Sequence, residues 1–361
     1  INILTMKHNF GAGPCILPKE VFQEASQAVI DFNNTGLSIL EISHRSKDFE
    51  QVMLEAEALV REILSVPQDY SVLFLQGGAS QQFAMVPMNI LPENGKAVYL
   101  DTGIWASKAA KEASNVGAIE IVASSSDKNY SYIPKAISVP SDASYFHYTS
   151  NNTIYGTEVF ENPNNTSIPT VVDMSSDIFS RVINVADYDL IYAGAQKNMG
   201  PAGVTLVIIK NTLLGTSNRK IPAIFDYQSH AKAGSMYNTP AVYSVYVSML
   251  NLRWLKAKGG VEVIEQENIV KARALYDEID RNPFFRGTAA LEDRSRMNIT
   301  FVMDTPEQEA AFLELAKQRD LIGIKGHRSV GGFRASIYNA LSITSINALI
   351  DAMREFEESK K

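Results

Sequence analysis

The stretch Ile191-Tyr-Ala-Gly-Ala-Gln-Lys-Asn-Met-Gly-Pro-Ala202 places a single lysine, Lys197, between two apolar runs. We expect these runs, 190–193 and 204–209, to be buried strands on either side of a Gly-Pro turn. An ammonium group in such a poorly solvated place is costly unless it is paired or neutralised. A desolvated lysine with a lowered pKa is also the amine that forms a Schiff base with an aldehyde cofactor. Lys197 is therefore a candidate cofactor lysine, and the alternative is a strand-capping lysine that points to water.

Composition limits the class of protein. With 361 residues, 45% of them hydrophobic and 20% charged, the chain suits a globular protein with one large and one smaller domain. A net charge of −7 without a Lys/Arg-rich run argues against nucleic acid as a partner. No apolar stretch approaches a membrane span or a signal peptide. The one cysteine, Cys15, excludes an internal disulfide and a multi-cysteine metal site, so we expect a cytoplasmic protein without a metal. Residues 1–5 precede Met6, which looks like a native start, and are left out of the fold prediction.

Short apolar runs alternate with helical patterns between about residues 50 and 210. This alternation is typical of an α/β domain in which helices cover both faces of a mostly parallel, mixed sheet. The expected strands are 71–75, 97–100, 119–122, 145–147, 170–172, 190–192 and 204–209, and the expected helices between them include 80–90 and 104–116.

The C-terminal part has a different pattern. A less regular segment, 211–238, precedes two long helical patterns that Gly259-Gly260 separates. We therefore predict a large domain over 15–257 and a smaller α+β domain over 258–361, to which residues 6–14 are added. The expected helices are 241–258, 261–281, 306–319 and 345–357, and the expected strands are 296–303 and 333–337.

Small and polar residues follow several predicted strands, at the edge where open α/β sheets bind ligands. Gln76-Gly-Gly-Ala-Ser80 either brings backbone N–H groups to a phosphate or is a plain turn with an N-cap. Trp105 either stacks on a flat ring or fills the core, and Thr153 could donate to a ring hydroxyl or a phosphate. Asp173 either needs a cation or caps a turn. A carboxylate after one strand and a lysine after the next form the pair that pyridoxal 5′-phosphate (PLP) enzymes use, so Asp173 and Lys197 together predict PLP.

Longer motifs are spread almost from end to end of the chain. They are Phe10-Gly-Ala-Gly-Pro14, Glu41-Ile-Ser-His-Arg45, Tyr192-Ala-Gly-Ala-Gln-Lys-Asn198, Ser235-Met-Tyr-Asn-Thr-Pro240, Gly326-His-Arg-Ser-Val-Gly-Gly-Phe-Arg-Ala-Ser336 and Ile337-Tyr-Asn-Ala340. On these motifs the chain resembles the phosphoserine aminotransferases, in the class V branch of the fold-type I PLP-dependent enzymes. The loop 149–156 departs from the family pattern, because Cys-Pro and two acidic residues occur there in well-known members, but Thr153 is retained.

The resemblance implies a role for each candidate cofactor residue. Lys197 would be the Schiff-base lysine, and Asp173 would be the partner of the pyridine nitrogen. Trp105 would stack on the ring, and Thr153 would lie beside its hydroxyl group. A homodimer with shared active sites is also implied, since two of the residues that bind the cofactor phosphate come from the second subunit in this family. The phosphate ligands would be Ala79, Ser80 and Gln196 of one subunit, with Asn238 and Thr239 of the other.

Two His-Arg-Ser tripeptides, 44–46 and 327–329, suggest a site for anions, and Arg334 follows the second. Arginine makes bidentate, charge-assisted bonds with carboxylates and phosphates, although an isolated His-Arg pair is more often a solvated loop. The resemblance implies that Arg334 binds the α-carboxylate of every substrate. The distal anion would be bound by His44 and Arg45 of the neighbouring subunit and by His327 and Arg328.

The reaction implied by the resemblance is a PLP-dependent transamination in serine biosynthesis. It would interconvert 3-phosphohydroxypyruvate and L-glutamate with O-phospho-L-serine and 2-oxoglutarate. Whether the enzyme also serves the phosphohydroxythreonine step of pyridoxine biosynthesis stays open at this point.

Two other classes fit the residues less well. A cysteine desulfurase needs a mobile catalytic cysteine, whereas Cys15 lies near the N-terminus, and an alanine–glyoxylate aminotransferase has no use for two His-Arg pairs. A nucleotide-binding dehydrogenase, or an α/β binding protein without activity, is the more distant alternative. The dinucleotide motif Gly-x-Gly-x-x-Gly does not follow the early strands, which argues against a dehydrogenase.

Overall fold

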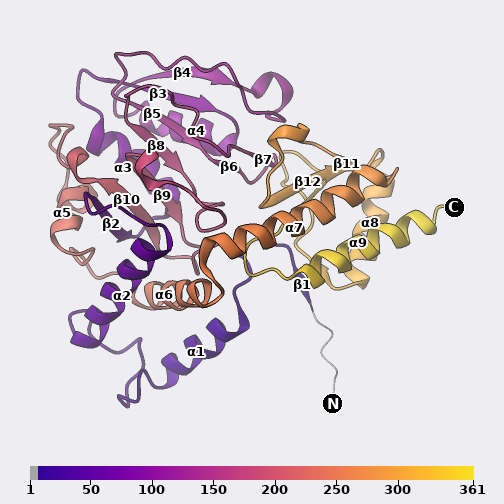
Figure 1. The fold of residues 1–361 in the computed structure, drawn as a ribbon, viewed down its shortest axis with the longest axis horizontal. Helices are drawn as coiled ribbons and strands as arrows, with labels where there is room; N and C mark the ends of the chain where they lie inside the picture. The colour runs from indigo at the N-terminus through magenta and orange to yellow at the C-terminus, as the bar shows by residue number, and fades with distance from the viewer. Residues whose placement is uncertain (1–6) are drawn as a thin grey trace.

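A seven-stranded sheet forms the centre of the larger part of the molecule in the computed structural model, which describes residues 7–361 (Figure 1). The strand order is β2-β10-β9-β8-β5-β3-β4, and every strand is parallel to the others except β10, which is antiparallel to both its neighbours. The predicted α/β fold with a mostly parallel mixed sheet is thus confirmed. The strands are β2 (Tyr70–Leu75), β3 (Lys96–Asp101), β4 (Ala118–Ser124), β5 (Tyr145–Thr149), β8 (Thr170–Asp173), β9 (Leu190–Gly194) and β10 (Thr205–Lys210).

Both faces of this sheet are buried, which explains why its strands read as continuous apolar runs. In β9, Leu190 and Tyr192 belong to the core on one face, and Ile191 and Ala193 belong to the core on the other. One face is covered by α3 (Gly78–Ile90), α4 (Ile104–Ala113) and α5 (Tyr227–Lys232). The other is covered by α2 (Lys47–Ile63), α6 (Val242–Ala257) and the start of α7 (Gly260–Arg281), and α1 (Lys19–Ile30) packs on α6.

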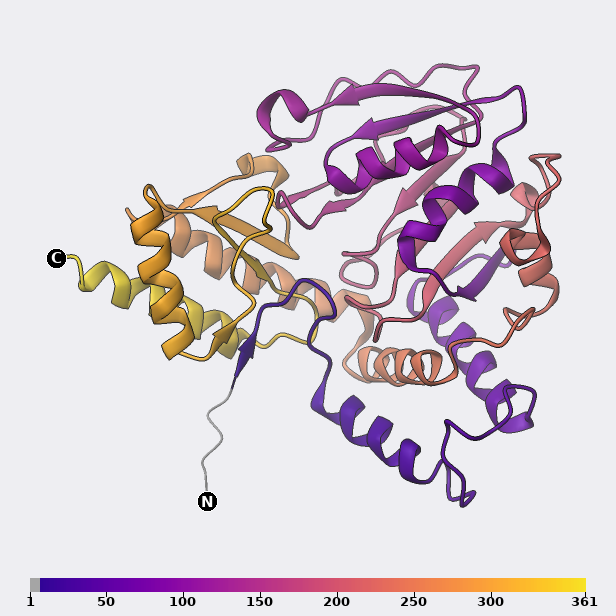
Figure 2. The same cartoon turned by 180° about the vertical axis from the view of Figure 1, so that it is seen from behind.

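The smaller part of the molecule is built on a three-stranded antiparallel sheet, β11-β12-β14 (Figure 2). A separate core of packed phenylalanine rings joins this sheet to α8, α9 and the second half of α7. Because α7 contributes to both cores, the division of the chain between residues 257 and 258 stays a prediction. The elements are β11 (Arg286–Gly287), β12 (Asn298–Val302), α8 (Pro306–Gln318), β14 (Phe333–Ser336) and α9 (Ile343–Glu358).

Two short strand pairs lie outside these two sheets, and the first of them joins distant segments of the chain. The strand β1 (His8–Asn9) pairs in parallel with β13 (Leu321–Ile322), and the following residue, Phe10, is fully buried in the small core. The second pair, β6 (Asn151–Asn152) with β7 (Thr157–Glu158), follows β5. Within residues 7–361, none of the helices combines the length and the apolar character needed to cross a membrane.

The core beneath α3 and α4 includes a histidine, His147. Its Nε2 lies 2.9 Å from the hydroxyl of Tyr192, and its ring stacks on Tyr99 with centroids 4.6 Å apart. Burial lowers the pKa of His147 to about 3. The native protein therefore holds a neutral imidazole, whereas an unfolded histidine takes up a proton below its usual pKa of about 6.5.

This difference in pKa predicts a loss of stability in acid. His147 contributes stability that is present above pH of about 6.5 and is lost as the pH falls towards the native pKa. Between pH 7.5 and 5.5 the contribution falls by about 1.4 kcal/mol, because only the unfolded chain binds the proton. The variant His147→Gln keeps a polar group for Tyr192 but does not titrate. Urea unfolding of both proteins at both pH values measures the effect, and identical pH dependences would contradict it.

Candidate active site

The carboxyl ends of the parallel strands meet at one edge of the sheet, and the predicted cofactor residues lie on the loops that leave it. Asp173 is the last residue of β8, Lys197 follows β9, and Thr153 follows β5, the neighbour of β8. A cavity of about 150 Å³ opens between these loops. Among the residues that line it are Ala79, Ser80, Trp105, Thr153, Asp173, Gln196 and Lys197.

Lys197 is held in this cavity with little to stabilise a positive charge. Its Nζ donates to Thr153 Oγ1 at 2.8 Å, a neutral acceptor. Desolvation lowers the pKa of Lys197 to about 8, although the negative charge of Asp173 opposes the shift, and the nearby charge of Arg334 adds to it. A substantial fraction of the amine is therefore uncharged in mildly alkaline solution, as a nucleophilic lysine requires.

Asp173 presents a buried carboxylate to the same cavity. The residue is 4% exposed and accepts a hydrogen bond from the backbone N–H of Ser175 at 2.9 Å. Burial raises its pKa, while the bonds from Ser175 and the charge of Lys197 lower it. A desolvated carboxylate of this kind is stabilised by a cationic or N–H donor partner in the cavity.

The loop before α3 forms a cradle for an anion. Gly77 and Gly78 have φ angles of +88° and +67°, a backbone conformation that favours glycine. The helix then begins without an acidic residue in its first turn, so its first N–H groups are available where Ala79 and Ser80 line the cavity.

The residues around the cavity fit the chemistry of PLP. An amine of lowered pKa suits its aldehyde, a buried carboxylate suits its ring nitrogen, and a helix N-terminus suits its phosphate. The side chain of Trp105, on the first turn of α4, adds a flat apolar wall. Among residues 7–361, no group of His, Cys, Asp and Glu side chains could hold a metal ion.

Arg334 lies on β14 of the small part and is close enough to Lys197 for its charge to lower the pKa of that amine. Its Nε is buried without a hydrogen-bond acceptor, and burial lowers the pKa of its guanidinium group. A buried donor without a partner is uncommon in folded proteins. This one leaves a guanidinium group free to bind an anion beside the cavity.

The second His-Arg pair lies next to Arg334. His327 is half-buried in the loop between β13 and β14, with Nδ1 2.6 Å from Ser329 Oγ. Burial lowers the pKa of His327, and the charges of Arg334, Arg328 and Lys108 lower it further. The small part thus directs a group of basic side chains towards the region of Trp105 and Lys197.

Seven of the predicted site residues do not line the cavity: the three basic residues just described, and four others. His44 and Arg45 belong to the loop between α1 and α2, where Arg45 is exposed. Asn238 and Thr239 are exposed in the loop before α6, and the carbonyl of Thr239 accepts from Gln76 Nε2 at 2.7 Å. Their assignment to a shared site stays a prediction, because it requires a second copy of the chain.

The sequence analysis did not assign a role to Asn151, which also lines the cavity. Its Nδ2 donates to Ser176 Oγ at 2.8 Å and to Asn298 Oδ1 at 2.7 Å, so it ties the loop after β5 to the small part. The departure of this loop from the family pattern was visible in the sequence, but its hydrogen-bond partners were not, because they are distant in the chain.

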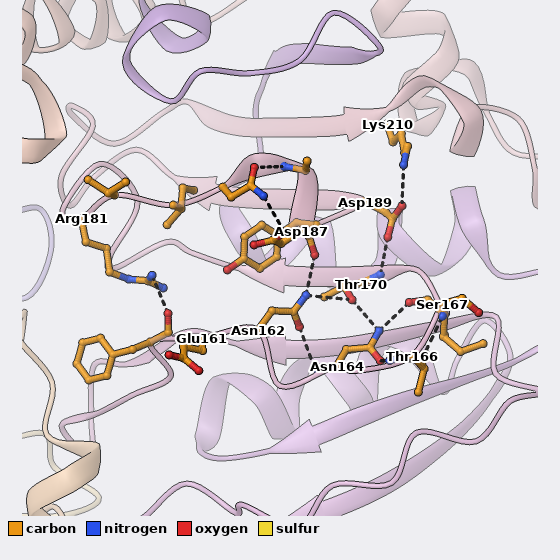
Figure 3. Close-up of a pocket in the computed structure, with 17 residues that line it drawn as sticks. Glu161, Asn162, Asn164, Thr166, Ser167, Thr170, Arg181, Asp187, Asp189 and Lys210 are labelled. Atoms are coloured by element: carbon orange, nitrogen blue, oxygen red, sulfur yellow. Dashed lines mark hydrogen bonds and ion pairs between the residues drawn. The ribbon is translucent and has the colours of Figure 1, made fainter.

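A larger polar cavity, of about 650 Å³, lies at the opposite end of the strands (Figure 3). It adjoins the first residue of β8, Thr170, and the last residue of β10, Lys210. Its polar groups bind one another: Asn164 Nδ2 donates to Thr170 Oγ1 at 2.8 Å, and Asn162 Nδ2 donates to the carbonyl of Asp187 at 2.6 Å. None of the predicted cofactor or substrate residues lines this cavity.

Comparison with known proteins agrees with the site geometry. The model of the aminotransferase class-V family matches residues 7–349. The chain is 58% identical to the phosphoserine aminotransferase of Flavobacterium johnsoniae over 352 residues, which is 97% of this chain and 99% of that protein. It is also 58% identical to the phosphoserine aminotransferase of Bacteroides thetaiotaomicron over 354 residues, or 98% of this chain and 99% of the relative.

Solved structures give the same result. The phosphoserine aminotransferase from Bacillus circulans subsp. alkalophilus superposes with a TM-score of 0.96 at 44% identity, covering 99% of each chain. The PLP-bound phosphoserine aminotransferase from Trichomonas vaginalis superposes with a TM-score of 0.91 at 35% identity, covering 97% of this chain and 100% of that one. The chain therefore belongs to the aminotransferase class-V family and, within it, to the PLP-dependent phosphoserine aminotransferases.

Proposed function

We propose that this chain transfers the amino group of L-glutamate to 3-phosphohydroxypyruvate, giving O-phospho-L-serine and 2-oxoglutarate, and that it does so in serine biosynthesis. The observation that carries the proposal is the buried, unpaired Nε of Arg334 beside the Lys197 cavity, with His327 and Arg328 next to it. Each of the proposed substrates has an α-carboxylate and a second anion. A site with two groups of cations next to a reactive amine suits that shape.

The roles of the side chains follow from their positions. When bound, PLP supplies an aldehyde and an electron-withdrawing ring. Lys197 would hold the aldehyde carbon, and its free amine would remove the proton from the substrate α-carbon and later return it, as base and then acid. Thr153 orients the Lys197 amine through the 2.8 Å hydrogen bond. Asp173 keeps a proton on the ring nitrogen, which requires that its own carboxylate stays charged.

An absorbance titration tests this proposal. O-phospho-L-serine is expected to convert the visible band of the bound cofactor to that of its amine form at a much lower concentration than L-alanine. An equal response to both amino acids would leave the cofactor site standing but contradict the anion site. A protein that shows no cofactor band after addition of PLP would contradict the role of Lys197.

Two arginine variants separate the anion sites. Arg334→Ala is expected to lower kcat/KM about 10- to 100-fold for phosphoserine, glutamate and alanine alike, because all three have an α-carboxylate. Arg328→Ala is expected to lower kcat/KM by a similar factor for phosphoserine, and to leave alanine unchanged because alanine has no distal anion. Steady-state kinetics with the three amino acids measure both. If Arg328→Ala weakens alanine as much as phosphoserine, the division between the sites is wrong.

We also propose a cytoplasmic homodimer with shared active sites. Support comes from the placement of Arg45 and Thr239 at the surface, away from their own cavity. The side chains of Leu37 and Leu40, which precede Arg45 in the chain, are 49% and 62% exposed. Such exposure of large apolar side chains in an isolated subunit is expected where a second subunit covers them.

The phosphohydroxythreonine of pyridoxine synthesis has the same two anions and is proposed as a second substrate of this site. Its turnover is measured beside that of phosphoserine.

A further inference from the structure

Lys108 is a basic residue next to the cavity to which neither the sequence motifs nor the family resemblance gave a role. It lies on α4 one helical turn after Trp105, and its Nζ sits 4.7 Å from the centroid of the Trp105 ring. Trp105 itself lines the Lys197 cavity. The ring therefore holds the exposed ammonium group of Lys108 at the rim of the site, through a cation–π contact rather than a carboxylate.

Lys108 and basic groups of the small part act on the same histidine, His327. The charges that lower the pKa of His327 are those of Arg334, Arg328 and Lys108. The charge of Lys108 thus acts on the same loop as the two arginines, although electrostatic interactions fall with distance and are screened by water. Arg334, Arg328 and Lys108 are all basic, although the chain as a whole has a net charge of −7. Such a concentration of like charges is unfavourable unless an anion occupies the space between them.

We propose that Lys108 is a specificity-determining residue, a further cation that the large part of the molecule places beside the distal anion of the substrate. The proposal rests on the proposed function, and it concerns the choice between substrates. A phosphate monoester carries a charge of about −1.5 to −2 at neutral pH, and a carboxylate carries −1. A flexible ammonium group acts as a point charge, whereas the arginine fork fixes orientation, so Lys108 favours the more highly charged phosphate over the side-chain carboxylate of glutamate.

Kinetics of Lys108→Gln test the proposal. We expect kcat/KM for O-phospho-L-serine to fall about 5- to 20-fold, through a rise in KM, because a charged hydrogen bond contributes about a tenfold factor to affinity. We expect kcat/KM for L-glutamate to fall less than about threefold. The dissociation constant of inorganic phosphate for the PLP-loaded enzyme, measured by calorimetry, is expected to rise by the same factor as KM for phosphoserine. The ratio between wild type and variant should shrink as ionic strength rises.

Two further variants serve as controls. Lys111→Gln removes an exposed lysine of the same helix, three residues further on, and should leave all constants unchanged. Lys108→Arg keeps the charge and should stay within about threefold of wild type. The role of Lys108 alone would be overturned if Lys108→Gln lost kcat/KM equally for phosphoserine and glutamate. It would also be overturned if Lys108→Gln lost no kcat/KM for phosphoserine while wild type turns this substrate over. Failure of wild type to turn over phosphoserine would overturn the proposed function and this inference together.

Discussion

Replacing Lys197 with alanine is expected to lower kcat for transamination by at least about 10⁴-fold, because the same amine holds the cofactor and moves the substrate proton. The structure gives this amine one hydrogen-bond partner, Thr153, and a pKa lowered to about 8 by desolvation. No other lysine lines the cavity, among the residues that the structure describes. A stopped assay with glutamate and 2-oxo acid acceptors, together with loss of the borohydride-reducible visible band, measures the effect.

A matched control is Lys210→Ala. Lys210 is the last residue of β10, at the opposite end of the strands, and its Nζ lies 3.8 Å from Asp189 Oδ1. The Lys210→Ala enzyme should retain full activity. If Lys197→Ala remained active, or if Lys210→Ala lost activity to the same degree, the assignment of the catalytic lysine would be wrong.

The inactive Lys197→Ala subunit also tests the shared site. When equal amounts of the Lys197→Ala and Arg45→Ala subunits are refolded together, half of the dimers contain one subunit of each kind. One of the two sites in such a dimer has the native Lys197 of one subunit and the native Arg45 of the other. At low phosphoserine the mixture is then expected to recover about a quarter of the wild-type rate. No gain above the sum of the two separate variants would place Arg45 outside the site.

The central residues of the site could be predicted because each directly follows an apolar run. Asp173 and Lys197 are within a few residues of β8 and β9, and in a parallel sheet such positions meet at one edge. Trp105 and Lys108 could also be placed together, since residues three apart share a helix face. These contacts depend on local structure, which the pattern of side chains encodes.

The remaining contacts depend on how the two parts of the molecule pack. The effect of the Lys108 charge on His327, and the hydrogen bond of Asn151 with Asn298, join segments separated by more than a hundred residues. No periodic pattern specifies such pairs. The ends of elements also differed by a few residues: the helix expected over 104–116 ends at Ala113, because the residues after it form a turn.

Asp173→Asn is expected to lower kcat about 10³-fold, since an amide cannot keep the ring nitrogen of the cofactor protonated as a carboxylate does. Asparagine has nearly the same shape and can still accept the hydrogen bond from the N–H of Ser175, so the fold should persist. The substitution is also expected to change the pKa of the Lys197 amine. The charge of Asp173 raises the pKa of that amine, so its removal should shift the pKa further below about 8.

The pH profile of Asp173→Asn therefore distinguishes a loss of electron withdrawal from a loss of structure. We expect an enzyme that binds PLP, has a low kcat at every pH and, in the cofactor-free form, has a Lys197 amine of lower pKa than wild type, measured from the pH dependence of its acylation. Asp69→Asn removes an exposed carboxylate and should match wild type in all three respects. A variant with near-normal kcat would show that the ring nitrogen needs no carboxylate here. Loss of PLP binding combined with an unchanged Lys197 pKa in the cofactor-free enzyme would instead make Asp173 a residue that only maintains the shape of the cavity, since its charge would then not reach Lys197.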